Sequence, residues 1–275
     1  MKIAFAVAAA VMAMLLTPGP ADAAPKFEHY VALGDSYAAV ADHTSLVGTP
    51  GCFRSSKSYP FQVAARLGIT DVVDVACGDA RAEHMTAPQQ LQPVGTNAAQ
   101  FDSLRPDTDL VTVSIGGNDG LVATLQSCIP TSLAGGSCEQ ALGPAAAELQ
   151  TNVSAKVGAV IDGIKARSPA ATIVYVGYPL LFPAGPCATL PVSPVNSAYL
   201  HTFEAAFNGV LAATARAHGA IAVDPSNVTG HDACQPPDVR YVEPLVPSVI
   251  TSPFHPNPAG AAFVGGLVAD AIRAA

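Results

Sequence analysis

Five short apolar runs alternate along this chain with stretches of helical periodicity, and this alternation constrains the fold more than any other feature of the sequence. The runs are mostly β-branched and cover residues 30–33, 72–76, 110–115, 172–176 and 220–223. Runs that are apolar at consecutive positions are typical of parallel strands buried on both faces. Apolar residues at helical spacing fall between and after them, at 60–67, 145–167, 196–218 and 258–274. The pattern predicts a doubly wound α/β sandwich.

Three segments interrupt this alternation, at residues 119–144, 179–194 and 228–253. They are rich in Pro, Gly and Ser, and they hold four of the six cysteines. In an α/β protein, insertions at the carboxyl ends of the strands commonly form the rim of a site. We expect these segments to be irregular and to surround such a site. No internal repeat and no linker divides the chain, so one domain is expected.

The first 23 residues have the pattern of a secretion signal. Lys2 supplies a positive start, residues 3–16 are almost entirely apolar, and Ala21 and Ala23 fit cleavage before Ala24. The apolar run is shorter than the roughly 20 residues that span a bilayer, and no later apolar segment is long enough. We therefore expect residues 1–23 to be a signal peptide and residues 24–275 to be a secreted domain without a transmembrane segment.

The six cysteines are interpreted as disulfide partners, because disulfides are the default outside the cytoplasm. The sequence has no Cys-x-x-Cys pair, no Cys/His cluster with zinc spacing, and no shared spacing among its seven histidines. We therefore expect no metal site and no cofactor. Among the possible pairings, the sequential one closes the shortest loops. The expected bridges are Cys52–Cys77, Cys128–Cys138 and Cys187–Cys234.

The charge balance limits the classes of partner. Thirteen Lys and Arg residues against 21 Asp and Glu residues give a formal net charge of −8. A nucleic-acid binder needs clustered basic side chains to neutralise phosphates, and a polybasic membrane-surface protein needs the same. Both classes are therefore excluded, and we expect a monomer that acts on a small-molecule or lipid substrate.

Three short clusters combine glycines or prolines with chemically active side chains. Residues 34–37 read Gly-Asp-Ser-Tyr and place Ser36 on a tight turn after the first strand. Residues 116–119 read Gly-Gly-Asn-Asp, and the Asn118 amide is a suitable donor to a developing oxyanion. His255 lies between two prolines just before the last helix, which restricts the backbone around a candidate base. All three clusters are expected at the same end of the sheet.

Together these clusters resemble the blocks of the SGNH (GDSL-type) hydrolase family, which is named for four blocks carrying Ser, Gly, Asn and His. The resemblance covers essentially all of residues 24–275, and the six cysteines make the chain look like secreted actinobacterial lipases and esterases. It implies a three-layer α/β/α sandwich around a five-stranded parallel sheet, with flavodoxin-like topology. It also implies that Ser36 is the nucleophile, that His255 is the general base, and that the Ser36 N–H and Asn118 hold the oxyanion.

The second block departs from the pattern of the family. Secreted members commonly carry a glycine two residues after the cysteine of this block, and its N–H donates to the oxyanion. Here Asp79 takes that position, after Cys77 and Gly78. Any non-proline residue offers a backbone N–H, whereas a carboxylate beside an oxyanion is unfavourable unless it points away. The donor therefore stays open between Asp79 and Gly78.

The group that orients the histidine also departs from the pattern of the family. Most members of the family carry an Asp three residues before the His, and here that position is Ser252, with Glu243 the nearest acid. Some secreted members use a backbone carbonyl in place of the carboxylate. We therefore expect the Ser252 carbonyl to fix the tautomer of His255, which leaves a Ser36/His255 dyad.

Two functions from different classes follow. The first is a secreted serine esterase or lipase, a carboxylic ester hydrolase acting on acyl lipids or short-chain esters through an acyl-enzyme on Ser36. The second is a non-catalytic module that binds an acyl chain or a glycan in the same cleft, an alternative that the departures at Asp79 and Ser252 keep open. The sequence predicts neither the length of the acyl chain nor whether acyl transfer competes with hydrolysis.

Overall fold

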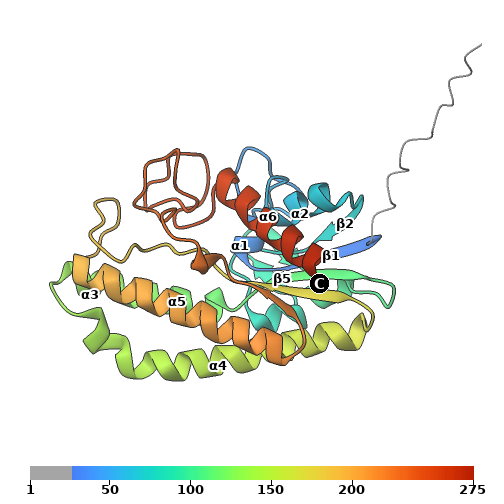
Figure 1. The fold of residues 1–275 in the computed structure, drawn as a ribbon, viewed down its shortest axis with the longest axis horizontal. Helices are drawn as coiled ribbons and strands as arrows, with labels where there is room; N and C mark the ends of the chain where they lie inside the picture. The colour runs from blue at the N-terminus through green and yellow to red at the C-terminus, as the bar shows by residue number, and fades with distance from the viewer. Residues whose placement is uncertain (1–26) are drawn as a thin grey trace, which may run out of the picture.

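The computed structural model describes residues 27–275, so the predicted signal peptide at residues 1–23 lies outside the described residues. Five parallel strands form one sheet in the spatial order β2–β1–β5–β6–β7 (Figure 1). Their bounds are β1 His29–Gly34, β2 Asp71–Asp74, β5 Leu110–Ser114, β6 Thr172–Val176 and β7 Ile221–Val223. This order is the flavodoxin-like one, and it confirms the predicted α/β fold.

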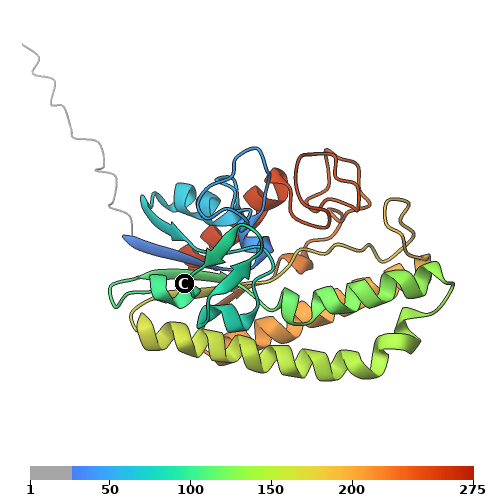
Figure 2. The same cartoon turned by 180° about the vertical axis from the view of Figure 1, so that it is seen from behind.

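Helices cover both faces of the sheet (Figures 1 and 2). One layer is made by α2 (Tyr59–Leu67) and α6 (Pro258–Ala274), the other by α4 (Cys138–Arg167) and α5 (Pro194–Ala217). Successive side chains of a strand point to opposite faces, so β1 buries Tyr30 and Ala32 in the first layer. Val31 and Leu33 of the same strand are buried in the second layer. This division explains why the strands are apolar at consecutive positions.

The two edge strands are less buried than predicted. β2 alternates between exposed and half-buried positions, with Val73 37% exposed, and two of the three residues of β7 are half-buried. An edge strand has a neighbour on one side only, and the covering helices centre on the middle strands. A short apolar run does not reveal its place in the sheet, so the expectation of burial on both faces is wrong for these two.

The segment 119–144, predicted to be irregular, is largely helical. It contains α3 (Leu121–Leu133) and the first seven residues of α4, and Pro130 lies inside α3. Gly135 adopts a left-handed conformation between the two helices, at φ 79°. The Ser137 hydroxyl then caps α4 by accepting a hydrogen bond from the Gln140 N–H. Gly135 and Gly136 therefore mark the junction between two helices, whereas Pro130 lies within a helix, and the expectation of an irregular insertion is corrected. The segments 179–193 and 228–253 form no helix or strand, as expected.

The hydrophobic periodicity of the sequence did not predict several short elements. They are α1 (Ser36–Ala39), the antiparallel pair β3 (Gln89–Leu91) and β4 (Gly95–Asn97), and the 3₁₀ helices η1 (Ala82–Met85), η2 (Gln100–Ser103), η3 (Gly117–Asp119) and η4 (Pro225–Asn227). The three sequential disulfides are confirmed: Cys52–Cys77, Cys128–Cys138 and Cys187–Cys234. Within residues 27–275, none of the helices combines the length and apolarity that crossing a bilayer requires.

Candidate active site

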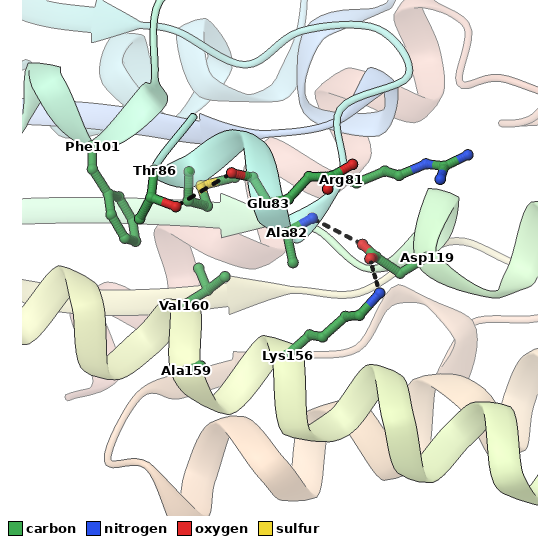
Figure 3. Close-up of a pocket in the computed structure, with 10 residues that line it drawn as sticks. Arg81, Ala82, Glu83, Thr86, Phe101, Asp119, Lys156, Ala159 and Val160 are labelled. Atoms are coloured by element: carbon green, nitrogen blue, oxygen red, sulfur yellow. Dashed lines mark hydrogen bonds and ion pairs between the residues drawn. The ribbon is translucent and has the colours of Figure 1, made fainter. Parts of the chain in front are cut away.

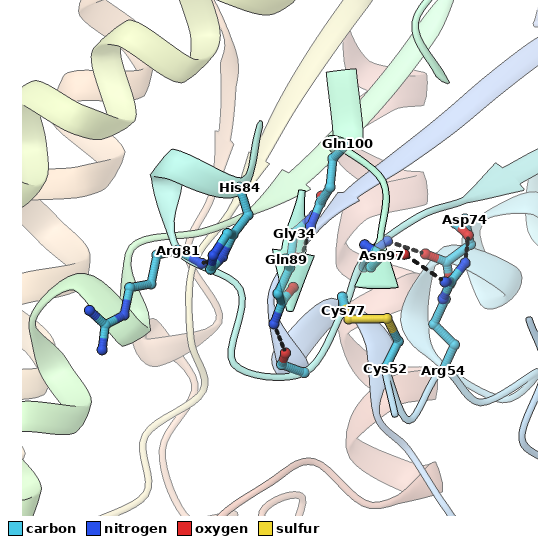
Figure 4. The surroundings of a disulfide bond; sticks show 12 residues. Gly34, Cys52, Arg54, Asp74, Cys77, Arg81, His84, Gln89, Asn97 and Gln100 are labelled. Atoms are coloured by element: carbon cyan, nitrogen blue, oxygen red, sulfur yellow. Dashed lines mark hydrogen bonds between the residues drawn. A yellow bond between two sulfur atoms is a disulfide. The ribbon is translucent and has the colours of Figure 1, made fainter. Parts of the chain in front are cut away.

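Ser36 is presented by a sharp turn between β1 and α1. Gly34 has a φ of 144°, and a Cβ at this position would collide with the Ser114 carbonyl oxygen. The Gln100 side chain holds both polar backbone groups of Gly34, accepting from its N–H at 2.7 Å and donating to its carbonyl at 2.8 Å (Figure 4). Asp35 then caps α1 by accepting the Tyr37 N–H at 3.0 Å. The turn therefore has one conformation, which places the serine at the carboxyl end of β1.

The structure brings Ser36 and His255 into contact. The Ser36 Oγ lies 2.7 Å from the His255 Nε2, within hydrogen-bond distance. Ser36 is 9% exposed and His255 is half-buried, so the pair lies at the base of a surface pocket. His255 belongs to the loop that leads into α6, whose first turn is capped by the Asn257 side chain accepting from the Gly260 N–H. A serine hydroxyl and an imidazole nitrogen are thus in the geometry that proton transfer needs.

The second ring nitrogen of His255 contacts a carbonyl, but not the expected one. Nδ1 lies 2.7 Å from the Pro253 carbonyl oxygen, so the prediction of the Ser252 carbonyl is corrected by one residue. The reason is local: Phe254 has a φ of 63°, and this left-handed residue folds the chain so that the preceding carbonyl faces the ring. The Ser252 hydroxyl instead lies 3.2 Å from His43 Nε2.

The Pro253 contact determines the tautomer of His255. A carbonyl oxygen can only accept, so Nδ1 carries the ring proton, and in a neutral imidazole Nε2 is then free to accept the Ser36 hydroxyl proton. Burial lowers the pKa of His255 below its usual value, and the nearby His43 lowers it further. The Pro253 carbonyl and the Asp79 charge raise this pKa and so offset part of the effect. The neutral form, which is the form a general base needs, is therefore favoured.

The block around Cys77 is held rigidly, and the N–H groups of Gly78 and Asp79 differ in whether they already have an acceptor. The Cys52–Cys77 disulfide joins it to the preceding loop, and Gln89 donates to the Gly78 carbonyl at 2.6 Å (Figure 4). The Gly78 N–H donates to the Cys52 carbonyl at 2.9 Å and is therefore engaged. The Asp79 N–H donates to no group among residues 27–275, and Asp79 lines the pocket with Ser36. Its φ of 59° is left-handed, a region that Asp tolerates better than most residues.

Two further N–H donors face the same pocket. The Ser36 N–H opens α1, where a backbone donor has no partner within the helix, and no acceptor takes it within the described chain. One amide hydrogen of Asn118 is used, because Nδ2 donates to the Ala80 carbonyl at 2.9 Å. An amide nitrogen has two hydrogens, so the second stays available to a ligand. The sequence-predicted residues Ser36, Asn118, Asp79 and His255 therefore meet at one pocket.

Two carboxylates anchor the loops of the site. The Asp35 carboxylate accepts the Tyr178 hydroxyl at 2.6 Å, and that hydroxyl accepts the Gly117 N–H at 2.7 Å. Burial raises the pKa of Asp35 to about 7. Asp119 accepts the Ala82 N–H at 2.9 Å and the Lys156 ammonium at 2.7 Å (Figure 3). These contacts connect the loops after β1, β2 and β5 to one another.

The pocket beside Ser36 has a volume of about 230 Å³ and one strongly apolar wall. That wall is the face of α3 formed by Leu121, Val122, Leu125 and Ile129, and Phe254 lies on the histidine side. The sequence interpretation missed this wall because it treated residues 119–144 as irregular. The spacing of the four residues, at three and four positions, is helical and could have identified it.

A second pocket, of about 400 Å³, lies between η1 and α4 (Figure 3). Its walls mix charged and apolar side chains: Arg81, Glu83, Asp119, Lys156, Met85 and Phe101. Its lining includes no Ser and no His, and two of its residues, Arg81 and Asp119, lie close in sequence to Asp79 and Asn118. Among residues 27–275, no three His, Cys, Asp or Glu side chains are grouped as metal ligands would be.

Comparison with known proteins gives consistent results. The profile of the GDSL-like Lipase/Acylhydrolase family matches residues 32–263. The chain is 35% identical over 258 residues to Lipase 2 of Streptomyces coelicolor, which covers 88% of this chain and 84% of that protein. The crystal structure of an extracellular lipase from Streptomyces rimosus superposes with a TM-score of 0.72 at 30% identity, over 90% of this chain and 99% of the other. Phospholipase A1 from Streptomyces albidoflavus NA297 gives a TM-score of 0.73 at 26% identity with the same coverage.

Proposed function

Because the chain belongs to the GDSL-like lipase/acylhydrolase family, and is therefore a carboxylic ester hydrolase, we propose that it hydrolyses esters through an acyl-enzyme on Ser36. His255 is the general base, and the Ser36 N–H, the Asp79 N–H and Asn118 bind the oxyanion. One observation carries this proposal: the 2.7 Å contact between Ser36 Oγ and His255 Nε2, in a ring whose Nδ1 faces a carbonyl.

The first half-reaction forms the acyl-enzyme. Ser36 Oγ bonds to the ester carbonyl carbon while its proton moves to His255 Nε2. The resulting imidazolium is stabilised through Nδ1–H by the Pro253 carbonyl, which carries less negative charge than the carboxylate of a triad. The carbon–oxygen bond to the alcohol then breaks, and His255 returns the proton to the leaving alkoxide oxygen.

The oxyanion is stabilised by donors that exist before the substrate binds. The Asp79 and Ser36 N–H groups and the second Asn118 amide hydrogen are without acceptors among residues 27–275. Donors already in place need no reorganisation as the charge develops, and removing one typically costs about 10²–10³ in rate. Gly78 is not a donor in this scheme because its N–H is engaged with Cys52.

Deacylation reverses the roles. A water molecule gives a proton to His255 Nε2 and its oxygen bonds to the acyl carbon, and the imidazolium then returns a proton to Ser36 as the bond to Oγ breaks. The released acid and the regenerated serine complete the cycle without a cofactor.

The α3 wall supports an apolar acyl group in the pocket. Leu121, Leu125 and Ile129 offer apolar surface beside Ser36, and covering such surface with a hydrocarbon chain contributes about 25 cal/mol per Å². We propose acyl lipids or medium-chain esters as substrates. Export is proposed on the signal-like residues 1–23 and on three disulfides, which suit an oxidising compartment.

A p-nitrophenyl ester assay tests the proposal. The wild-type protein should release p-nitrophenol, and Ser36→Ala and His255→Ala should each lower kcat by at least about 10³-fold. A burst of p-nitrophenol equal to the enzyme concentration, or an acyl adduct on Ser36 seen by mass spectrometry, would identify the intermediate. Ester binding without turnover would favour the non-catalytic binding module instead, and turnover that survives Ser36→Ala would contradict the nucleophile.

A further inference from the structure

A fully buried carboxylate lies behind the loop that carries His255, and the mechanism above does not use it. Glu243 is 0% exposed, although a charged carboxylate is rarely buried without several partners. It is also the acid nearest to His255 along the sequence. Its side chain does not contact the imidazole, since the Nδ1 partner is the Pro253 carbonyl.

The Glu243 carboxylate accepts four hydrogen bonds. Oε2 accepts from Arg240 at 2.9 Å, from the Ser248 N–H at 2.7 Å and from the Ser248 hydroxyl at 3.0 Å. Oε1 accepts from the Asn257 amide at 2.8 Å. These bonds hold the pKa of Glu243 below its usual value against the effect of burial, so the group stays charged. One side chain therefore ties residue 248 to the cap of α6, across the loop that contains His255.

The backbone of Glu243 holds the histidine loop directly. Its N–H donates to the His255 carbonyl at 2.9 Å, and its carbonyl accepts the Phe254 N–H at 3.0 Å. The Phe254 carbonyl is fixed from the other side, by the Tyr37 hydroxyl at 2.6 Å. Both peptide groups of the left-handed Phe254 are thus constrained, and a non-glycine residue keeps such a conformation only when its surroundings impose it.

We propose that Glu243 is a positioning residue for His255: its carboxylate fixes residues 240–257 so that Phe254 stays left-handed and the Pro253 carbonyl stays on Nδ1. This inference rests on the proposed role of His255 as the base. It differs from a triad, in which a carboxylate contacts the ring, because here the carboxylate acts on the loop and a carbonyl contacts the ring. Without the hydrogen bonds of the Glu243 carboxylate, Phe254 would leave the left-handed conformation and the Pro253 carbonyl would turn away from Nδ1. His255 Nε2 would then be out of contact with Ser36 for part of the time.

The test compares Glu243→Gln with a matched control, Glu204→Gln. Glu204 is also buried, at 3% exposed, and it accepts the N–H groups of Leu181 and Phe182, which lie outside the histidine loop. Burial raises the pKa of Glu204 to about 8, so at pH 7 the amide replaces a mostly neutral acid. Glu243→Gln should lower kcat about 10–100-fold with KM changed less than about threefold, since small misplacements of a catalytic group have effects of this size. Glu204→Gln should leave kcat within about twofold of wild type.

Two readouts separate positioning from loss of stability. All rates are measured on protein shown to be folded by circular dichroism at the assay temperature. The His255 Nδ1–H should give a low-field proton resonance in the wild type, identified by its absence in His255→Ala, and Glu243→Gln should broaden or remove it. The acid limb of kcat/KM should also move toward the pKa of free imidazole, because the His255 ring becomes more exposed in the variant. The other groups that face the ring, Asp79, His43 and Tyr37, are the same in both proteins, so they do not cause this shift.

A milder variant, Ser248→Ala, tests the inference if Glu243→Gln does not fold. Ser248→Ala removes one hydroxyl bond and leaves the buried Arg240–Glu243 pair intact. It should lower kcat about threefold and broaden the Nδ1–H resonance. A Ser248→Ala enzyme with wild-type kcat and resonance would overturn the inference, as would a folded Glu243→Gln enzyme that matches Glu204→Gln. Turnover by Ser36→Ala or His255→Ala would instead refute the proposed function itself.

Discussion

His255 Nε2 and Ser36 Oγ lie 2.7 Å apart although 219 positions separate them in the chain. The contact forms because the loop after β1 and the loop before α6 meet at the carboxyl end of the sheet. The serine turn is held by Gly34, Gln100 and Asp35, and the histidine loop is held by Tyr37 and Glu243. The Ser36–His255 contact therefore depends on two rigid loops that the Tyr37–Phe254 hydrogen bond joins.

The pH dependence of hydrolysis should reflect the lowered pKa of His255. Only the neutral ring accepts the Ser36 proton, so kcat/KM should fall as the pH drops through the pKa of this group. Because burial lowers that pKa, the acid limb should lie below pH 6.5, the usual value for imidazole. A pH profile with a short-chain p-nitrophenyl ester measures it, and an acid limb above pH 6.5 would contradict the burial of the ring.

Ser252→Ala should retain activity to within about threefold. The Nδ1 partner is the Pro253 carbonyl, and the variant leaves this backbone group in place while removing only the hydroxyl near His43. Steady-state kinetics beside His255→Ala provides the comparison. A fall to the level of His255→Ala would show that the Ser252 side chain orients the base.

Asp79→Gly should keep or raise kcat, by up to about tenfold. Glycine retains the N–H and accepts the left-handed φ of 59° without strain, while a negative charge near the oxyanion disappears. The same charge raises the pKa of His255, so the acid limb of the variant should also shift to lower pH. Loss of more than about tenfold in kcat would mean that the carboxylate itself has a function in the site.

Leu125→Trp should shift the chain-length preference toward short acyl groups. Leu125 lines the pocket from α3, and a larger ring there would occupy space that the end of a longer chain needs. We expect the ratio of kcat/KM for octanoyl over butyryl esters to fall about tenfold. Leu133→Trp is the matched control, because Leu133 lies on the same helix, is 70% exposed and does not line the pocket. An equal effect of both variants would place the acyl group elsewhere.

Stability should decrease as the pH rises from about 4 to about 8. Burial raises the pKa of Asp35 to about 7 and of Glu204 to about 8, whereas both carboxyls ionise near pH 4 in the unfolded chain. Between these values the folded state binds more protons, so the free energy of unfolding falls with pH, by at most about 1.4 kcal/mol per pH unit for each group.

Urea unfolding at several pH values between about 5 and 9 measures this slope. Glu204→Gln should make the slope shallower, because an amide does not titrate. A wild-type protein that gains stability between pH 6 and 8 would show that these two carboxyls are already ionised in the folded state.

Local chemistry accounts for much of what was predictable. The five strands, the four helices α2, α4, α5 and α6 and their order follow from periodicities that act within about 20 residues. The helix α3, the ends of the helices and the burial of the edge strands do not follow from them. The turn at Gly34, the cluster at Asn118 and the loop at His255 are recognisable because each needs particular residues at adjacent positions. The three disulfides follow from the shortest-loop argument.

The amino-acid order alone determined the parallel sheet, the residues offered to the site and the disulfide pairs, since periodicity, turn chemistry and loop length act between near neighbours. Only the tertiary structure decided that Pro253 rather than Ser252 faces the ring, that Gly78 is engaged, and that α3 forms the wall of the pocket. Each of these depends on a contact between distant segments, such as the bond from Tyr37 to the Phe254 carbonyl across 217 positions. A hydrogen-bond partner is selected by where the folded backbone aims each group, and no single stretch of sequence carries that information.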